Sequence, residues 1–73
     1  MINLSEGKVG VTYNVVAVEG DSKVMRRLCD LGFLGAQVKI DKISGLRGVY
    51  LIEIRGALIS IRARILKSVR VTE

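Results

Sequence analysis

The sequence contains no histidine, no proline and no tryptophan, and it has a single cysteine. Histidine is the usual general base near neutral pH and the commonest transition-metal ligand, so its absence removes the most common acid–base and metal chemistry. No potential nucleophile in the chain has an identifiable activating partner either. We therefore expect a protein that is not an enzyme and that has no catalytic residues.

The lone cysteine, Cys29, can form neither an internal disulfide nor, without further ligands, a tetrahedral metal site. Because small secreted domains usually depend on disulfides, one cysteine favours the reducing cytoplasm. We expect Cys29 to be a small buried hydrophobe and not a thiolate ligand. We expect no metal site and no cofactor in the monomer. Weak divalent-metal binding, or a site between chains that uses Cys29 or carboxylates, stays open.

Acidic side chains are too few to suggest a metal centre of their own. Glu19 and Asp21 flank Gly20 and have oxygen ligands suited to a hard cation. The same residue types are common in turns and helix caps, and we expect that role here.

Long apolar runs are also absent. The longest, residues 15–18 and 49–52, are far shorter than the ~20 residues that a helix needs to span a bilayer. The first six residues show neither the basic region nor the apolar region of a secretory signal. We expect no transmembrane segment, no targeting segment and a cytoplasmic location.

What the chain does have is aliphatic, β-branched sequence. Hydrophobic residues make up 49% of its 73 residues, and this composition is typical of half-buried strands. The length indicates one domain, residues 1–73. Alternation of apolar and polar residues predicts strands over residues 11–19, 37–41, 50–55, 59–64 and 69–72. A change of parity at Val15 and Val16 predicts a bulge in the first of these.

One helix is predicted over residues 23–31, between a cap at Asp21 or Ser22 and a stop at Gly32. Its apolar face is expected to contain Val24, Met25, Leu28 and Leu31. Gly56 and Ala57 predict a short hairpin, residues 44–48 a turn, and residues 65–68 a helical turn. The fold class is therefore mainly β, a five-stranded small barrel with one short α-helix, and the alternative is an open α+β sheet.

The net charge is +5, and its excess lies in the C-terminal half. Residues 47–73 hold six basic and two acidic side chains, against six and five in residues 1–46. Arg62 and Arg64 are predicted to share one face of a strand, where they could contact an anionic partner or form an ordinary solvated face. Nucleic acid is a further candidate ligand, although few aromatic residues are available for base stacking.

Two large apolar residues, Phe33 and Leu34, stand in a predicted loop bounded by Gly32 and Gly35. An apolar loop tip either closes the end of a barrel or contacts a partner. We expect Phe33 to fill the barrel end and Leu34 to be exposed. Phe33, Leu34, Arg62 and Arg64 are the candidate partner-binding residues.

An ordered set of short motifs runs through nearly the whole chain. The sharpest is Arg27-Leu28-Cys29-Asp30-Leu31-Gly32-Phe33, and others are Leu4-Ser5, Gly20-Asp21, Ile52-Glu53-Ile54-Arg55-Gly56, Ile61-Arg62, Val69 and Val71. In this order they resemble the family of ferrous iron transport protein A (FeoA). Two positions depart from the family pattern. The loop at residues 34–36 lacks the usual proline and is one residue shorter, and Leu66 replaces a common alanine.

The resemblance implies an SH3-like small barrel and an accessory role in ferrous iron uptake. The partner it implies is the cytoplasmic part of a membrane ferrous iron permease that carries a GTP-binding domain, which would bring the protein to the inner membrane through that partner. Nucleic-acid binding is not expected of such a protein. A nucleic-acid-binding barrel and an oligomeric interaction module unrelated to iron remain the alternative functions.

Overall fold

The computed structural model describes residues 1–45 and 48–73. Its elements follow in the order β1 (Ile2–Asn3), η1 (Leu4–Glu6), β2 (Thr12–Val18), α1 (Ser22–Asp30), β3 (Gln37–Ser44), β4 (Val49–Ile54), β5 (Ala57–Arg62), α2 (Ala63–Leu66) and β6 (Val69–Thr72). The mainly β prediction is confirmed, and part of the predicted turn at residues 44–48 lies outside the described residues. No helix in these two stretches is long and apolar enough to cross a membrane.

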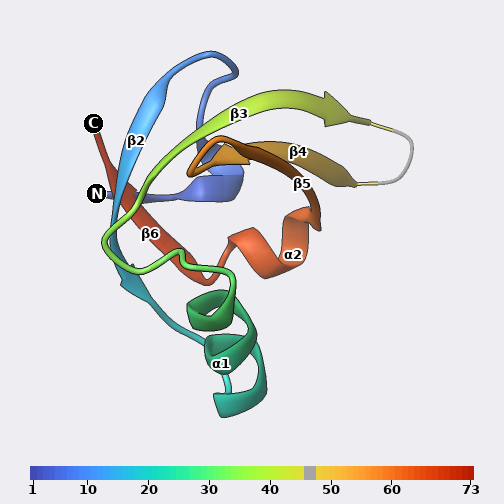
Figure 1. Ribbon diagram of the computed structural model, residues 1–73. Coiled ribbons are helices and arrows are strands. Elements are labelled where there is room, and N and C mark those ends of the chain that lie inside the picture. The colour runs from blue at the N-terminus through green and yellow to red at the C-terminus, as the bar shows by residue number, and fades with distance from the viewer. Residues whose placement is uncertain (46–47) are drawn as a thin grey trace.

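The strands form one antiparallel sheet in the order β1-β6-β2-β3-β4-β5. Figure 1 shows how this sheet curls around a common interior. Its two ends are joined by other contacts: η1 packs on α2, and the Tyr50 hydroxyl of β4 donates to the Ser5 carbonyl at 2.7 Å. The sheet is therefore a barrel held together at its seam by η1 and α2.

The sheet described has six strands and not the predicted five, because β1 was not predicted. Ile2 and Asn3 pair with Val71 and Arg70 of β6. Two residues are too few to show alternation, so no pattern in the sequence marks this strand. The predicted bulge in β2 is confirmed, because its register against β6 shifts between Val15 and Ala17.

The β4–β5 hairpin turns at Arg55 and Gly56, one residue earlier than the predicted Gly56 and Ala57. Both turn residues have positive φ, 50° and 80°. Positive φ at both central residues is the geometry of a type I′ turn, whose twist matches that of the strands. The register continues from Ile54 opposite Ala57 to Val49 opposite Arg62.

The predicted strand over residues 59–64 ends earlier than expected. β5 stops at Arg62, and Ala63 begins α2. Ala63 and Arg64 continue the alternation of β5, but Leu66 is fully buried one helical turn after Ala63. Burial of Leu66 with helical spacing explains why the chain leaves the sheet here. Arg64 is thus a helix residue and not a strand residue.

Helix α1 begins one residue earlier than predicted, and Asp21 is its N-cap. The Asp21 carboxylate accepts a hydrogen bond from the Val24 amide at 2.9 Å. Gly32, with φ of 82°, follows the helix and lets the chain turn back. The predicted apolar face is only partly right. Leu28 is buried, whereas Met25 and Leu31 are 39% and 37% exposed.

The core consists of apolar side chains from every strand except β1, together with η1, α1, α2 and the loop after α1. Its members are Leu4, Tyr13, Val15, Leu28, Phe33, Ala36, Val38, Ile40, Ile52, Ile54, Ile61, Leu66, Val69 and Val71. No polar or charged residue among those described is buried with them.

Candidate interaction surface

The loop after α1 separates its two apolar residues as predicted. Phe33 is 0% exposed and Leu34 is 57% exposed. The Phe33 amide donates to the Leu28 carbonyl at 3.1 Å, and the Phe33 carbonyl accepts from Ala36 at 3.0 Å. These bonds hold the ring of Phe33 in the core and leave Leu34 at the tip of the loop. Contact of Leu34 with a partner stays a prediction.

Arg62 and Arg64 are both exposed, as predicted, but they come from different elements. Arg62 ends β5 and precedes α2, and Arg64 lies within α2. The two side chains nevertheless line the same groove, of about 300 Å³. Arg62 and Arg64 therefore lie at a strand–helix junction and not, as the sequence predicted, on one face of a strand.

This groove, called here the α1–β5 groove, has one wall from α1 and the other from β5 and α2. Its lining residues are Arg27, Leu28, Leu31, Ser60, Ile61, Arg62, Arg64 and Ile65. The charged members are all arginines, and the others are apolar except Ser60. Arginines beside apolar side chains suit an amphipathic, anionic ligand.

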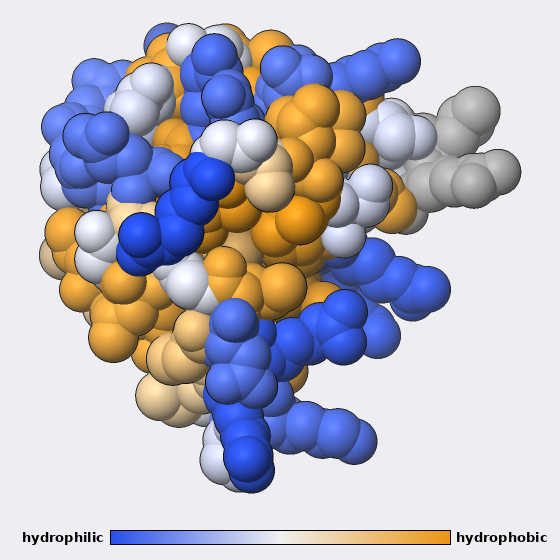
Figure 2. Space-filling model, viewed as in Figure 1, coloured by the Kyte–Doolittle hydropathy of each residue, from blue (hydrophilic) through white to orange (hydrophobic). Residues whose placement is uncertain are grey.

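Two further hollows adjoin the groove and share residues with it. One, on α1, is lined by three basic residues, one acidic residue and one apolar residue: Lys23, Arg26, Arg27, Asp30 and Leu31. The other includes Arg62, Arg64 and Lys67. Together they form one basic surface, defined by Lys23, Arg26, Arg27, Arg62, Arg64 and Lys67. Figure 2 shows hydrophilic side chains extending from the part of the molecule where α1 and α2 lie.

The basic surface is not neutralised from within the described part of the chain. The ion pairs found there are Lys39–Glu53, with 3.4 Å between the charged atoms, and Arg70–Glu19, with 2.6 Å. Neither involves a residue of the basic surface. Its positive charge is thus available to an anionic partner.

The sequence prediction missed Lys23, Arg26, Arg27 and Lys67. The first three stand at helical spacing on one face of α1, and that amphipathic pattern is visible in the sequence. What the sequence does not show is that this face lies beside Arg62 and Arg64.

The prediction that Cys29 is buried is wrong, because its side chain is exposed. Cys29 follows Leu28 on α1, and only the stripe centred on Leu28 faces the core. Asp21 caps α1, as expected. Glu19 instead accepts from the Arg70 guanidinium of β6 and forms an ion pair with it. Across residues 1–45 and 48–73, no three cysteine or carboxylate side chains gather as a metal-binding group.

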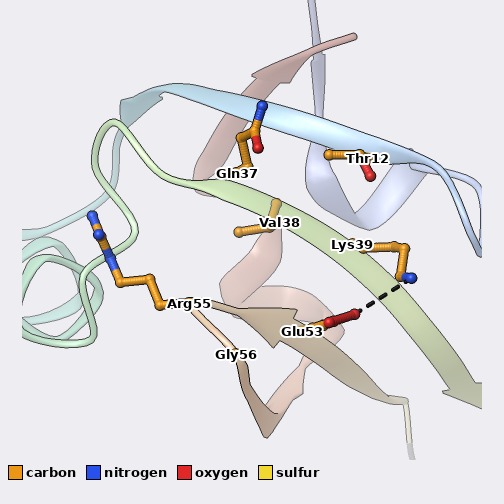
Figure 3. Close-up of a pocket in the computed structure, with 7 residues that line it drawn as sticks. All are labelled: Thr12, Gln37, Val38, Lys39, Glu53, Arg55 and Gly56. Carbon is orange, nitrogen blue, oxygen red and sulfur yellow. Dashed lines mark ion pairs between the residues drawn. The ribbon is translucent and has the colours of Figure 1, made fainter.

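A second polar pocket, of about 220 Å³, lies over β2, β3 and the β4–β5 turn (Figure 3). Lys39 and Glu53 form their ion pair across its floor. Arg55 points away from them toward the loop after α1, where its Nε donates to the Gly32 carbonyl at 3.3 Å. The charged groups of this pocket are therefore engaged within the chain, and the α1–β5 groove is the better candidate site.

Comparisons with known proteins agree with the fold. The model of the FeoA domain matches residues 2–73. The FeoA protein from Chlorobium tepidum is 31% identical, with a TM-score of 0.85, and the match covers 96% of this chain and 68% of that one. The FeoA-like protein from Clostridium acetobutylicum is 25% identical, with a TM-score of 0.88 over 97% and 84% of the two chains.

Metal-dependent regulators share the fold alone. The manganese regulator SloR is 12% identical, with a TM-score of 0.84, and the match covers 99% of this chain but 34% of that one. No curated protein sequence matches the chain. The expected SH3-like barrel is confirmed in its architecture, with six strands in place of five. The chain belongs to the FeoA family, which takes part in iron(II) transport.

Proposed function

We propose that this protein is an accessory protein of ferrous iron uptake that acts by binding the cytoplasmic part of a membrane ferrous iron permease with a GTP-binding domain. The observation that carries the proposal is the match of the FeoA domain to residues 2–73. The basic surface on α1 and α2 supports it, because six basic side chains gather there and none of them is in an ion pair among the described residues. The proposal implies a cytoplasmic location, peripheral to the membrane.

In this role the protein binds and does not catalyse. A chain without histidine has no side chain that titrates near neutral pH in its unperturbed state, and its one cysteine has no second thiol beside it. Ferrous iron is the cargo of the permease in this proposal and not a resident group of the monomer. Titration calorimetry of the monomer with Fe²⁺ or Zn²⁺ is expected to show weak binding. A stoichiometric submicromolar site would contradict this view.

The test is purification of tagged protein, in parallel, from detergent-solubilised membranes and from cytosol of the native host. We expect a polytopic membrane protein with a G-domain in the membrane fraction, identified by mass spectrometry. Recovery of RNA or DNA without a membrane protein would refute the adaptor role.

Nucleic-acid binding is the second candidate, and the basic surface is the observation in its favour. The aromatic residues argue against single-strand binding. Phe33 and Tyr13 are buried, and the hydroxyls of Tyr13 and Tyr50 are bonded to the Lys8 amide and the Ser5 carbonyl. No aromatic ring is therefore presented for base stacking within the described residues. Self-association is the third candidate, and sedimentation of the purified protein tests it.

A further inference from the structure

Strand β5 is an edge of the sheet. Among the described residues, the strand order ends at β5, which pairs with β4 alone. The two-residue turn at Arg55 and Gly56 makes Ile54 and Ala57 a hydrogen-bonded pair, and the bonded pairs then alternate along the register. Ile59 and Ile61 therefore bond to β4, while Leu58 and Ser60 direct their backbone N–H and C=O groups away from it.

Those outward groups have no partner in the part of the chain that the structure describes. No backbone or side-chain hydrogen bond outside the ladders involves Leu58 or Ser60. A row of unpaired N–H and C=O groups on an edge strand is a template for another extended segment.

The α1–β5 groove runs along this edge. It is lined on one side by Ser60, Ile61 and Arg62 of β5 and on the other by α1. Among the described residues, β4 contributes none to the lining, so the groove lies beside the edge strand and not over the face of the sheet. A segment in the groove would thus meet the free backbone groups of Ser60. Its continuation along β5, beyond the residues that line the groove, would meet those of Leu58.

The side chains of the groove fix the chemistry of such a segment. Arg27 lies on α1, and Arg62 and Arg64 lie on the opposite wall. The arginines can therefore bind carboxylates on either side of an extended segment. Guanidinium groups bind carboxylates through two parallel hydrogen bonds. Between the arginines, the 37% exposed Leu31 and the half-buried Ile65 offer apolar surface for one aliphatic side chain.

We propose that the α1–β5 groove binds an extended acidic segment of the partner protein, which adds to β5 as a seventh strand. The proposal rests on the proposed function only for the identity of that partner. Backbone bonds to Leu58 and Ser60 give the segment its register, and the three arginines select its charge. Specificity comes from alternate side chains of the segment, as in other cases of strand addition.

The shape of the site separates this occupant from two others. A bilayer presents a broad surface, whereas the groove is a hollow of about 300 Å³ that a single peptide side chain can enter. Single-strand binding usually uses aromatic platforms, and no tyrosine or phenylalanine is among the described residues that line the groove. Vesicles and an oligonucleotide therefore serve as contrasting probes.

The first experiment follows the backbone amides of ¹⁵N-labelled wild-type protein by NMR. The probe is a short synthetic peptide of alternating glutamate and threonine with one central leucine, and its control has lysine for glutamate. We expect only the acidic peptide to shift the amides of β5 and α1. At saturation, hydrogen exchange at Leu58 and Ser60 should slow in proportion to the ratio of free peptide to Kd.

Other outcomes would overturn the proposal. They are no shift in the groove with the acidic peptide, or shifts there without slowed exchange at Leu58 and Ser60. Stronger effects at these amides from phosphatidylglycerol vesicles or an oligothymidylate would favour a membrane or a nucleic acid instead. Slowed exchange that depends on protein concentration, with no peptide present, would indicate a second copy of this chain as the occupant.

Two variants test the two kinds of contact separately. Arg62→Glu with Arg64→Glu should weaken peptide binding at least about tenfold, because the carboxylates would face like charge. Lys8→Glu with Lys42→Glu is the matched control, since both lysines are exposed away from the groove and the net charge changes equally. Ser60→Pro removes one outward amide, which an edge strand tolerates, and should also weaken binding.

Permease capture then separates this proposal from the proposed function. If wild-type protein captures the permease and the Arg62→Glu, Arg64→Glu variant captures it equally well, the groove proposal is wrong and the function stands. If wild-type protein captures no permease, the proposed function is wrong. In that case the groove proposal is tested independently, by the hydrogen-exchange measurement with the acidic peptide.

Discussion

The inner face of the sheet and helix α1 bury their apolar residues to very different extents. Val38, Ile40 and Ile52 on the strands are almost completely buried, and they belong to a core that includes residues of β2 to β6. On α1, only Leu28 is buried, while Met25 and Leu31 keep more than a third of their surface. Apolar burial is the main stabilising term in folding, so the barrel holds most of the stability.

This difference indicates that the barrel core provides stability and that α1 provides surface for binding. Leu28, with the partly buried Val24, holds helix α1 on the barrel, and most of its other side chains are exposed. Arg27 of α1 lines the same groove as Arg62 and Arg64 of the β5–α2 junction. Substitutions in the core should therefore change stability, and substitutions on α1 or around the groove should change binding.

The largest effect is expected from Phe33→Ala. The ring is fully buried, and removing it leaves a cavity in a small core. Such a truncation costs ~3–5 kcal/mol, which is a large part of the stability of a domain this small. Urea denaturation followed by circular dichroism measures the change. A loss below ~1 kcal/mol would mean that the loop after α1 does not close the barrel.

A smaller loss is expected from Asp21→Ala, which removes the N-cap of α1. The carboxylate accepts from the Val24 amide, and such a cap contributes ~1 kcal/mol. Asp21→Asn is the matched control, because asparagine caps about as well as aspartate. Denaturation should show that Asp21→Ala is less stable than both the wild-type protein and Asp21→Asn. A loss as large as that of Phe33→Ala would contradict the division between barrel and helix.

Leu34→Ala should cost well under ~1 kcal/mol, because Leu34 is exposed and surface changes usually have small effects. Comparing its loss of stability with that of Phe33→Ala tests whether only one of these two neighbouring residues belongs to the core. The same variant tests the contact role of the loop by pull-down with the cytoplasmic region of the permease. Binding as strong as that of wild-type protein would exclude Leu34 as a contact and leave the basic surface as the candidate.

Local patterns in the sequence were enough to predict most of the barrel. Alternation marked β2 to β6, and parity marked the bulge near Val16, because a strand with one buried face repeats every two residues. Asp21 and Gly32 marked the two ends of α1 within one residue. The burial of Phe33 beside an exposed Leu34 followed from the two flanking glycines and the direction change between helix and strand.

Other features depend on contacts between distant segments. The burial of Leu66 converts the end of the predicted fourth strand into α2, and alternation alone cannot show this. Cys29 is exposed because the barrel accepts only the stripe around Leu28, which is narrower than the apolar side of the helix. The groove joins Arg27 to Arg62 and Arg64 across the fold, so no local pattern could predict it.

The smallest effect on stability is expected from Arg62→Glu combined with Arg64→Glu. Both side chains are exposed, and neither takes part in an ion pair among the described residues. Exposed charges contribute ~0–1 kcal/mol to folding, so the melting temperature should stay nearly unchanged.

Ile61→Ala is the matched control on the same strand. Ile61 is buried, and its truncation should cost ~2–5 kcal/mol. If the arginine variant loses as much stability as the isoleucine variant, these arginines are part of the structural framework. Stability that is unchanged, together with lost binding, would place them in the contact surface alone.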